Sequence, residues 1–182
     1  MVKEPRAGRV KTRLGAGIGM TNAAWWFRHQ SRALLRRLDD PRWQIVLAVS
    51  PDREGLCSRF WPSQLLRVAQ GGGDLGQRMA RILFGFRHSP TIIIGADIPA
   101  IQKHHIERAF AALGQCDAVI GPAKDGGFWL IGMKRAIGRR RAQFGDVRWS
   151  TGDAMADTLA TLSGANVAFI DTLNDVDTAT DL

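Results

Sequence analysis

Short apolar runs alternate with amphipathic patterns along most of this 182-residue chain. The apolar runs are typical of buried strands and cover residues 43–49, 65–69, 91–96, 117–123, 127–132 and 166–171. Between them the spacing predicts helices at 21–38, 75–86, 102–113 and 150–162. Strands that alternate with helices favour a mostly parallel sheet with helices on both faces. We therefore expect an α/β fold, with a local hairpin only where 117–123 and 127–132 follow each other.

The helix boundaries carry weaker signals. Thr21 and one residue of the pair Ser150 and Thr151 are suitable N-caps, because their hydroxyls can accept a hydrogen bond from the first turn. The glycine-rich segment 15–20 follows a basic stretch and no strand, so we expect a flexible turn there and no dinucleotide-binding fingerprint. No repeat or linker divides the chain, which predicts a single domain over residues 1–182.

Composition limits the class of protein. A hydrophobic content of 45% suits a globular domain with a proper core. No apolar run approaches the length that crosses a membrane, and the first residues lack the apolar segment of a signal peptide. Cys57 and Cys116 form neither a zinc motif nor a disulfide framework, so we expect a cytoplasmic protein.

The net charge of +8 is unevenly distributed. Basic residues gather in 1–42 and 134–148, whereas residues 151–182 contain aspartates and no Lys or Arg. This segregation suits a phosphate-bearing small ligand between a basic loop and acidic metal ligands. An RNA-binding surface is the alternative, but no motif of the common RNA-binding folds is present, so nucleic acid is not the expected partner. The arginine run 139–141 is equally well explained as a solvated surface or a compositional bias.

Asp97 follows three consecutive isoleucines at the end of an apolar run. A carboxylate in this place is costly unless a cation pairs with it, and ligands of such sheets bind beyond the carboxyl ends of the strands. We interpret Asp97 as a ligand of a hard divalent cation, Mg²⁺ or Mn²⁺. The alternative is that Asp97 only caps the helix that begins near Gln102.

Two loops have the chemistry of phosphate binding. In the first, basic residues crowd a stretch that Pro5 and Gly8 restrain: Lys3, Arg6, Arg9, Lys11 and Arg13. Lys11 and Arg13 are two residues apart, so in an extended segment both point the same way and can hold one diphosphate. In the second loop, Gly71–Gly73 permit close backbone approach and Asp74 opens a helix, which favours a nucleotide at Gly72, Gly73 and Asp74. A simple strand-to-helix turn explains the second loop equally well.

The spacing Lys-x-Pro-x-x-Gly-x-Val-Lys-Thr-Arg-Leu at 3–14 resembles the opening motif of a bacterial glycosyltransferase-like family of nominally unknown function, sometimes called arsenosugar-biosynthesis-type glycosyltransferases. The resemblance continues through GGGDLGQRM, IIIGADIPAI, GPAKDGGFWLIGM, WST at 149–151 and DVDTATDL at 175–182. It implies a Rossmann-like GT-A nucleotide-diphospho-sugar transferase fold. It also implies kinship with guanylyltransferases that act on phosphorylated small molecules.

The resemblance implies roles for particular residues. Asp97 matches the metal-binding acid, and Asp175 and Asp177 match an acidic stretch near the metal; a solvated acidic tail is the alternative for these two. Lys11 and Arg13 match the phosphate-binding loop. The acceptor side is implied at Gly126, Gly127, Trp149, Ser150 and Thr151. Asp125 is the candidate general base, and an Asp-Gly turn between two strands is its alternative.

Members of that family begin with a longer apolar strand, whereas this chain supplies only Met1 and Val2, so we expect a truncated first strand. The leading hypothesis is a metal-dependent enzyme that transfers a sugar from a nucleotide-diphospho-sugar to a small-molecule acceptor. The first alternative is a nucleotidyltransferase that uses a nucleoside triphosphate, and the second is a catalytically inactive nucleotide-binding protein.

Overall fold

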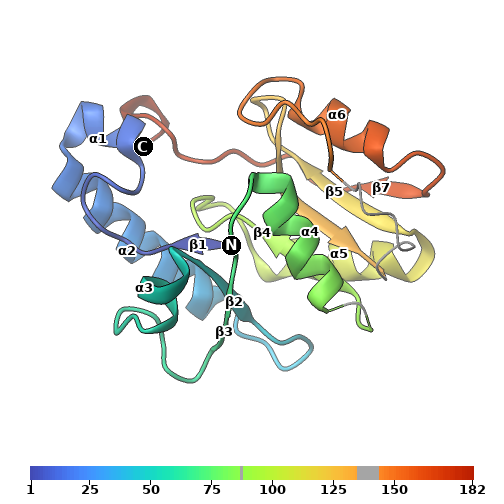
Figure 1. The fold of residues 1–182 in the computed structure, drawn as a ribbon, viewed down its shortest axis with the longest axis horizontal. Helices are drawn as coiled ribbons and strands as arrows, with labels where there is room; N and C mark the ends of the chain where they lie inside the picture. Colours follow the sequence, from blue (N-terminus) through green and yellow to red (C-terminus); the bar gives the residue numbers. More distant parts are fainter. Residues whose placement is uncertain (87, 135–143) are drawn as a thin grey trace. The chain divides into compact units, whose positions relative to one another are not determined.

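Two β-sheets organise the chain, and each carries its own helices (Figure 1). The computed structural model describes residues 1–86, 88–134 and 144–182. The chain divides into two compact units. The first unit comprises residues 1–71, 95–103 and 175–182, and the second comprises 72–94 and 104–174.

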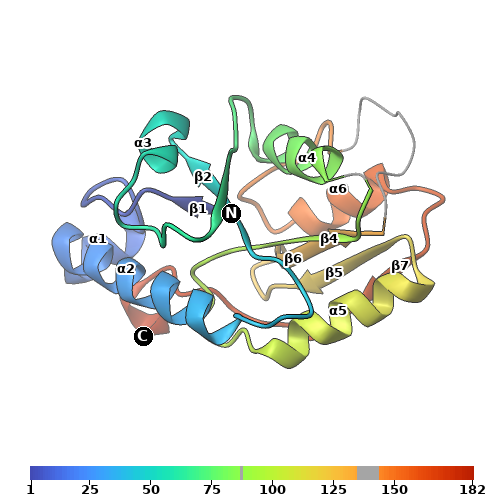
Figure 2. The same ribbon diagram turned by 90° about the horizontal axis from the view of Figure 1, so that it is seen from below.

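The first unit is built on a three-stranded parallel sheet in the order β1-β2-β3. Its strands are β1 (Val2–Lys3), β2 (Val46–Ser50) and β3 (Leu66–Ala69). Its helices are α1 (Thr12–Ile18), α2 (Met20–Arg37), α3 (Asp52–Leu56) and the short 3₁₀ helix η1 (Ala179–Asp181). Helix α2 lies on one side of this sheet and α3 on the other (Figure 2).

The second unit contains a four-stranded sheet in the order β4-β6-β5-β7. Its strands are β4 (Thr91–Ile94), β5 (Ala118–Pro122), β6 (Phe128–Met133) and β7 (Val167–Phe169). Strand β6 runs antiparallel to β4 and β5, while β5 and β7 are parallel. Helix α5 (Lys103–Gln115) lies on one side of the sheet, and α4 (Leu75–Gly85) and α6 (Ala154–Thr161) lie on the other (Figure 2).

Burial follows the hydrophobic pattern that predicted these elements. Helix α4 buries Met79, Ile82 and Leu83, which recur at the spacing of one helical face. The central strands β5 and β6 are buried along most of their length, as expected for strands covered on both faces. The predicted α/β class and the predicted hairpin of 117–123 with 127–132 are both confirmed.

The segment predicted to be a turn is largely helical. Helix α1 covers Thr12–Ile18 and includes Gly15 and Gly17, so the prediction of a flexible turn over 15–20 is wrong. Gly19 then separates α1 from α2 with a φ of 88°, a conformation that glycine adopts without strain. Thr21 consequently lies inside α2, because Gly19 occupies the N-cap position that was predicted for Thr21.

The N-cap prediction for α6 is also wrong. Asp153 occupies that position, and Thr151 belongs to the preceding turn, where its hydroxyl donates to the carbonyl oxygen of Arg148. The arginine run 139–141 lies outside the described residues. Throughout the described part of the chain, no helix combines the length and the apolar character needed to cross a bilayer.

Candidate functional site

Five charged residues of the first unit meet around one buried ammonium group. We call Lys11, Arg13, Asp97, Asp175 and Asp177 the charged cluster. The Nζ atom of Lys11 lies 2.5 Å from Oδ2 of Asp97, 3.4 Å from Oδ2 of Asp175 and 3.3 Å from Oδ1 of Asp177. The guanidinium of Arg13 contacts the other oxygen of Asp177 at 2.7 Å. The sequence predicted that these five residues belong to one site. The structure brings them together within the first unit.

Lys11 is held by the backbone at the start of α1. Its φ of 46° and ψ of 49° are left-handed, a conformation that costs a residue with a side chain roughly 1–2 kcal/mol. Lys11 is the N-cap residue of α1, but its ammonium group has no acceptor with which to cap the helix, and its side chain extends toward the three carboxylates. The flanking residues Val10 and Leu14 are buried, which fixes the loop on both sides of the lysine. Strain that packing holds in place is typical of functional sites.

Asp97 is fixed by its own backbone and by the turn that follows it. Its carbonyl oxygen accepts a hydrogen bond from the backbone nitrogen of Val176 at 3.2 Å. Downstream, the guanidinium of Arg37 on α2 donates to the carbonyl oxygens of Pro99 and Ile101. These bonds fix the backbone around Asp97, and its carboxylate pairs with the buried ammonium of Lys11, which goes beyond the role of a helix cap.

The two C-terminal acids reach the cluster because an apolar residue lies between them. Val176 is buried and packs with Leu14 and Ala23 in a small core of the first unit. In an extended segment, neighbouring side chains point in opposite directions. Burial of Val176 therefore turns Asp175 and Asp177 to the opposite side, where both contact Lys11.

A close approach between α1 and η1 holds the C-terminal segment, residues 175–182, against α1 (Figure 1). A Cβ atom on Gly17 would lie 2.8 Å from the Cβ of Ala179, which is closer than side chains pack. Glycine at position 17 therefore lets the C-terminal residues lie directly against α1. The same contact brings Asp175 and Asp177 alongside the residues at the start of that helix.

The pKa values show how burial and charge compete in the cluster. Burial acts against the charge of Lys11, but Asp97, Asp175 and Asp177 outweigh it, and the pKa of Lys11 is raised. Burial also raises the pKa of Asp175, although Lys11 acts in the opposite direction. Burial would raise the pKa of Asp177 too, but hydrogen bonds from Arg13 and Lys11 prevail and the pKa of Asp177 is lowered.

The arrangement does not fit a preformed metal site. Three carboxylates are the hard oxygen ligands that Mg²⁺ and Mn²⁺ favour. Within residues 1–86, 88–134 and 144–182, however, no group of three or more His, Cys, Asp or Glu side chains is arranged to hold a metal ion. The carboxylates of Asp97, Asp175 and Asp177 converge on the ammonium of Lys11, which is itself the cation between them.

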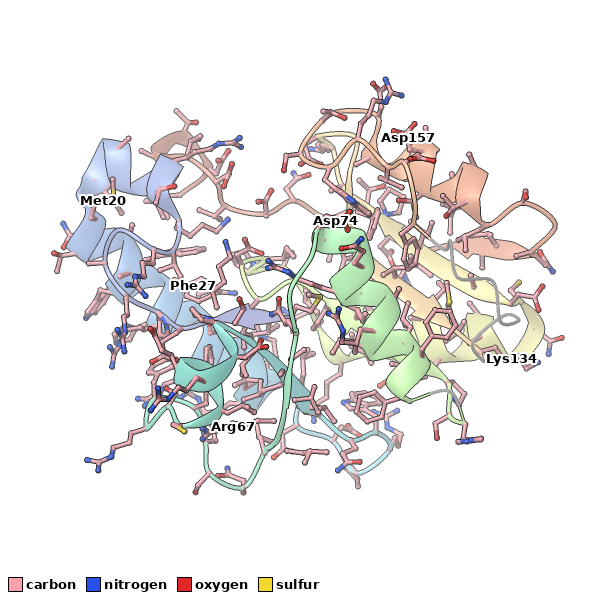
Figure 3. All side chains as sticks on the ribbon, in the orientation of Figure 1. Met20, Phe27, Arg67, Asp74, Lys134 and Asp157 are labelled. Atoms are coloured by element: carbon pink, nitrogen blue, oxygen red, sulfur yellow. The ribbon has the colours of Figure 1, made fainter. Side chains whose placement is uncertain are left out.

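The other predicted phosphate-binding residues lie apart from these contacts. Lys3 is exposed at the end of β1 and, among the described residues, forms no ion pair with the cluster. In the second unit, Asp74 caps α4: its carboxylate accepts from the backbone nitrogen of Gln77 at 2.8 Å (Figure 3). The carbonyl oxygens of Gly72 and Gly73 accept from arginines of α4. The structure thus gives Asp74 a local structural role, and nucleotide binding at 72–74 stays a prediction.

Asp125 occupies the turn between β5 and β6. Its side chain is exposed, and Oδ1 accepts a hydrogen bond from the backbone nitrogen of Gly127 at 2.9 Å. Gly126 has a φ of 84°, and a Cβ there would lie 2.0 Å from the carbonyl oxygen of Gly152. The absence of a side chain at Gly126 therefore allows this turn to pack against Gly152 in the loop before α6. Asp125 keeps one carboxylate oxygen, Oδ2, outside this hydrogen bond.

The predicted acceptor residues 149–151 form the loop before α6. Trp149 packs against the start of α4, because a Cβ on Gly76 would lie 2.7 Å from its ring, and its ring meets Phe128 edge-on. Ser150 has a left-handed φ of 63°. Together with Asp125, Gly126 and Gly127, these residues form one loop region of the second unit, and their role toward an acceptor stays a prediction.

Three residues that support the charged cluster were not identified from the sequence. Val176 directs the two acids, Gly17 admits η1, and Arg37 holds the turn after Asp97. The alternation of Asp, Val and Asp at 175–177 is typical of an extended segment with one buried side, and it could have indicated that Val176 is buried. Gly17 and Arg37 act on segments about 160 and 60 residues away, and no local pattern marks such contacts.

Comparison with known proteins identifies solved structures with a similar fold. A crystal structure from Desulfovibrio desulfuricans G20, of a protein provisionally designated a nucleotide-diphospho-sugar transferase, is 32% identical in sequence with a TM-score of 0.85. The match covers 97% of this chain and 80% of that one. A homologue from Mycobacterium sp. strain JC1 of the M. tuberculosis protein Rv0371c is 17% identical with a TM-score of 0.54, covering 85% and 78% of the two chains. No protein of curated function gives a significant match.

The fold is therefore that of the nucleotide-diphospho-sugar transferases, as the sequence predicted. Residues 33–151 match the model of the family DUF2064, whose description is "uncharacterized protein conserved in bacteria". The chain belongs to this family.

Proposed function

We propose that this protein is a transferase that takes a sugar from a nucleotide-diphospho-sugar, and that Lys11 and Arg13 bind the diphosphate of the donor. The observation that carries the proposal is that Arg13, whose side chain is 72% exposed, presents its guanidinium in the same cluster as Lys11, where both contact Asp177. The support from comparison is the designation of the structural relative that is 32% identical.

The chemistry of such a transfer suits these side chains. Negative charge accumulates on the diphosphate as the bond to the sugar breaks, and fixed cations at that position stabilise the transition state. Arg13 can offer two parallel N–H groups to phosphate oxygens, whereas Lys11 acts as a compact point charge. Arg13 is largely exposed on one side of the cluster, so a ligand can reach it without unfolding the loop.

The divalent cation predicted from the sequence stays a prediction. If Mg²⁺ or Mn²⁺ binds here, the residues that would hold it are Asp97, Asp175 and Asp177. Its chemistry would be neutralisation of the leaving diphosphate. Because Lys11 lies between these carboxylates, we assign no step of the reaction to the ion.

Asp125 is proposed as the general base or as the group that orients the acceptor hydroxyl. The replacement Asp125→Asn keeps an oxygen that can accept from Gly127, so the turn and the melting temperature should be preserved. Loss of a general base lowers turnover about 10²-fold or more. We expect this loss in hydrolysis of the donor, with the exposed Asp39→Asn as the control. Unchanged turnover would reduce Asp125 to a residue of the turn.

The main alternative is a nucleotidyltransferase, and one experiment separates the two activities. A sugar transferase should slowly hydrolyse its donor to a free nucleoside diphosphate when no acceptor is present. A nucleotidyltransferase should exchange labelled pyrophosphate into a nucleoside triphosphate. We expect hydrolysis with at least one donor of a panel of nucleotide-sugars. Pyrophosphate exchange without hydrolysis of any donor would establish the alternative instead.

The narrower resemblance to arsenosugar-biosynthesis-type glycosyltransferases concerns the substrate and stays a prediction. The same panel addresses it, because it identifies the nucleobase and the sugar directly. Binding of nucleotide-sugar without hydrolysis or exchange would favour the third hypothesis, an inactive nucleotide-binding protein.

A further inference from the structure

The cation at the centre of the charged cluster is part of the protein. The ammonium of Lys11 contacts a carboxylate oxygen of each of Asp97, Asp175 and Asp177 at 2.5–3.4 Å. Only 6% of the Lys11 side chain is exposed, whereas the three acids are 27%, 37% and 34% exposed. The acids thus face solvent on one side and the lysine on the other.

A divalent ion bound by the same carboxylate oxygens, Oδ2 of Asp97 and Asp175 and Oδ1 of Asp177, would need nearly the same position as the ammonium group. Mg²⁺ and Mn²⁺ lie about 2.0–2.2 Å from their oxygen ligands, and Ca²⁺ lies about 2.3–2.6 Å away. An ion and an ammonium group cannot both contact these three oxygens at such distances. Their like charges would also repel each other strongly in this partly buried place.

The protein holds Lys11 in this position from several directions. The left-handed backbone at Lys11, the buried neighbours Val10 and Leu14, and the backbone bond from Val176 to Asp97 all fix the geometry. Strain that the surrounding packing holds in place is typical of functional sites. The task of Lys11 in the absence of ligand is to neutralise the acids.

We propose that Lys11 is the resident cation of the charged cluster, and that Lys11 and a divalent cation exclude each other from it. Mn²⁺ binds to Asp97, Asp175 and Asp177 only when the ammonium of Lys11 is removed from between them. The inference concerns the site of the proposed transferase, but it holds whatever group the enzyme transfers. Its test uses no nucleotide, so the two proposals can fail separately.

The test is a titration of the full chain with Mn²⁺, in which electron paramagnetic resonance measures the free ion. Lys11→Met should bind one Mn²⁺ at least tenfold more tightly than the wild type. The double variant Lys11→Met with Asp97→Asn should lose most of this gain, because one ligand charge is missing. Lys103→Met, which removes a lysine that pairs with Asp40 outside the cluster, should bind Mn²⁺ as the wild type does.

A second measurement covers the possibility that Lys11→Met folds poorly. Mn²⁺ should raise the melting temperature of Lys11→Met and of Lys11→Gln by more than that of the wild type, since the ion replaces the lost cation. The proposal is wrong if neither variant gains this Mn²⁺-dependent rise. It is also wrong if the wild type binds Mn²⁺ as tightly as Lys11→Met, or if Asp97→Asn leaves the gain intact. Any of these results would leave the assignment of donor hydrolysis untouched.

Discussion

The two units use their candidate residues in different ways. In the first unit, Lys11, Asp97 and Asp177 come from distant parts of the chain, and their charges contact one another directly. In the second unit, Asp125 and Asp74 bond to backbone groups two or three residues away. Local bonds of this kind are what turns and helix starts require, whatever the function. Convergence of distant charges has no such local explanation, so it is the stronger sign of a site.

The difference has a physical origin. A loop residue can satisfy its own carboxylate with nearby N–H groups at little cost in conformational entropy. To bring Lys11, Asp97 and Asp177 together, the fold must order three segments and partly bury four charges, counting Asp175. Burial of charge costs several kcal/mol per ion unless each is paired. A fold that bears this cost in one place gives reason to test that place first.

The largest expected effect on stability is that of Lys11→Met. The change leaves three partly buried carboxylates without their central cation, which in a buried pair costs 3–5 kcal/mol. Because the acids are about a third exposed, water reduces the cost, and we expect a loss of about 2 kcal/mol in the free energy of unfolding. Urea unfolding measures it. Arg148→Met removes a 62% exposed arginine that pairs with Asp153 and Asp157 in the second unit, and it should cost clearly less. Equal losses in unfolding free energy for Lys11→Met and Arg148→Met would mean that the charged cluster is no more than an ordinary surface ion pair.

A smaller effect is expected from Gly17→Val. The new side chain would overlap Ala179 and push η1 away from α1, at a cost of about 1–2 kcal/mol. Amide exchange of Val176 should become faster, because its bond to Asp97 depends on the same contact. Gly114→Ala in α5 meets no atom within 4 Å and should be neutral or stabilising. Unchanged exchange at Val176 would show that the glycine does not position the acids.

The smallest effect is a dependence on alkaline pH. The pKa of Lys11 is raised above its usual 10.5 in the folded protein, so its pairing contributes fully below pH 10.5 and is lost as pH rises through the folded pKa. The difference in unfolding free energy between wild type and Lys11→Met should therefore be constant near neutrality and shrink above pH 10.5. Urea unfolding at a series of pH values measures it. A difference that stays constant into this range would mean that Lys11 is not stabilised as a cation.

The sequence predicted the fold class because the evidence was local. Apolar runs and helical spacing identified the strands and most helices, and the short KDG connection identified the hairpin of β5 and β6. Helix α1 was missed because Gly15 and Gly17 have poor helix propensity. Close packing against Met20 and Ala179 overrides this propensity, and it depends on contacts that no local pattern encodes.

The charged cluster was predicted in its members but not in its arrangement. Charge segregation and the family resemblance selected Lys11, Arg13, Asp97, Asp175 and Asp177. The sequence assigned the acids to a metal and the basic residues to phosphate, since each type has a familiar ligand. It could not show that Lys11 would reach the acids itself. That contact depends on a left-handed backbone at Lys11 and on burial of Val176.

The central claim is that the charged cluster binds the diphosphate of the donor, and Arg13→Met tests it most directly. The Arg13 side chain is 72% exposed, so its replacement should leave the fold intact. Arg9→Met removes another exposed arginine of the same loop, one that pairs with Glu54 of α3, and serves as the matched control. Calorimetry with a panel of nucleoside diphosphates gives the affinities. We predict that Arg13→Met weakens the best ligand at least tenfold, about 1.4 kcal/mol, while Arg9→Met binds as the wild type does. Equal affinity of Arg13→Met and the wild type would contradict the account.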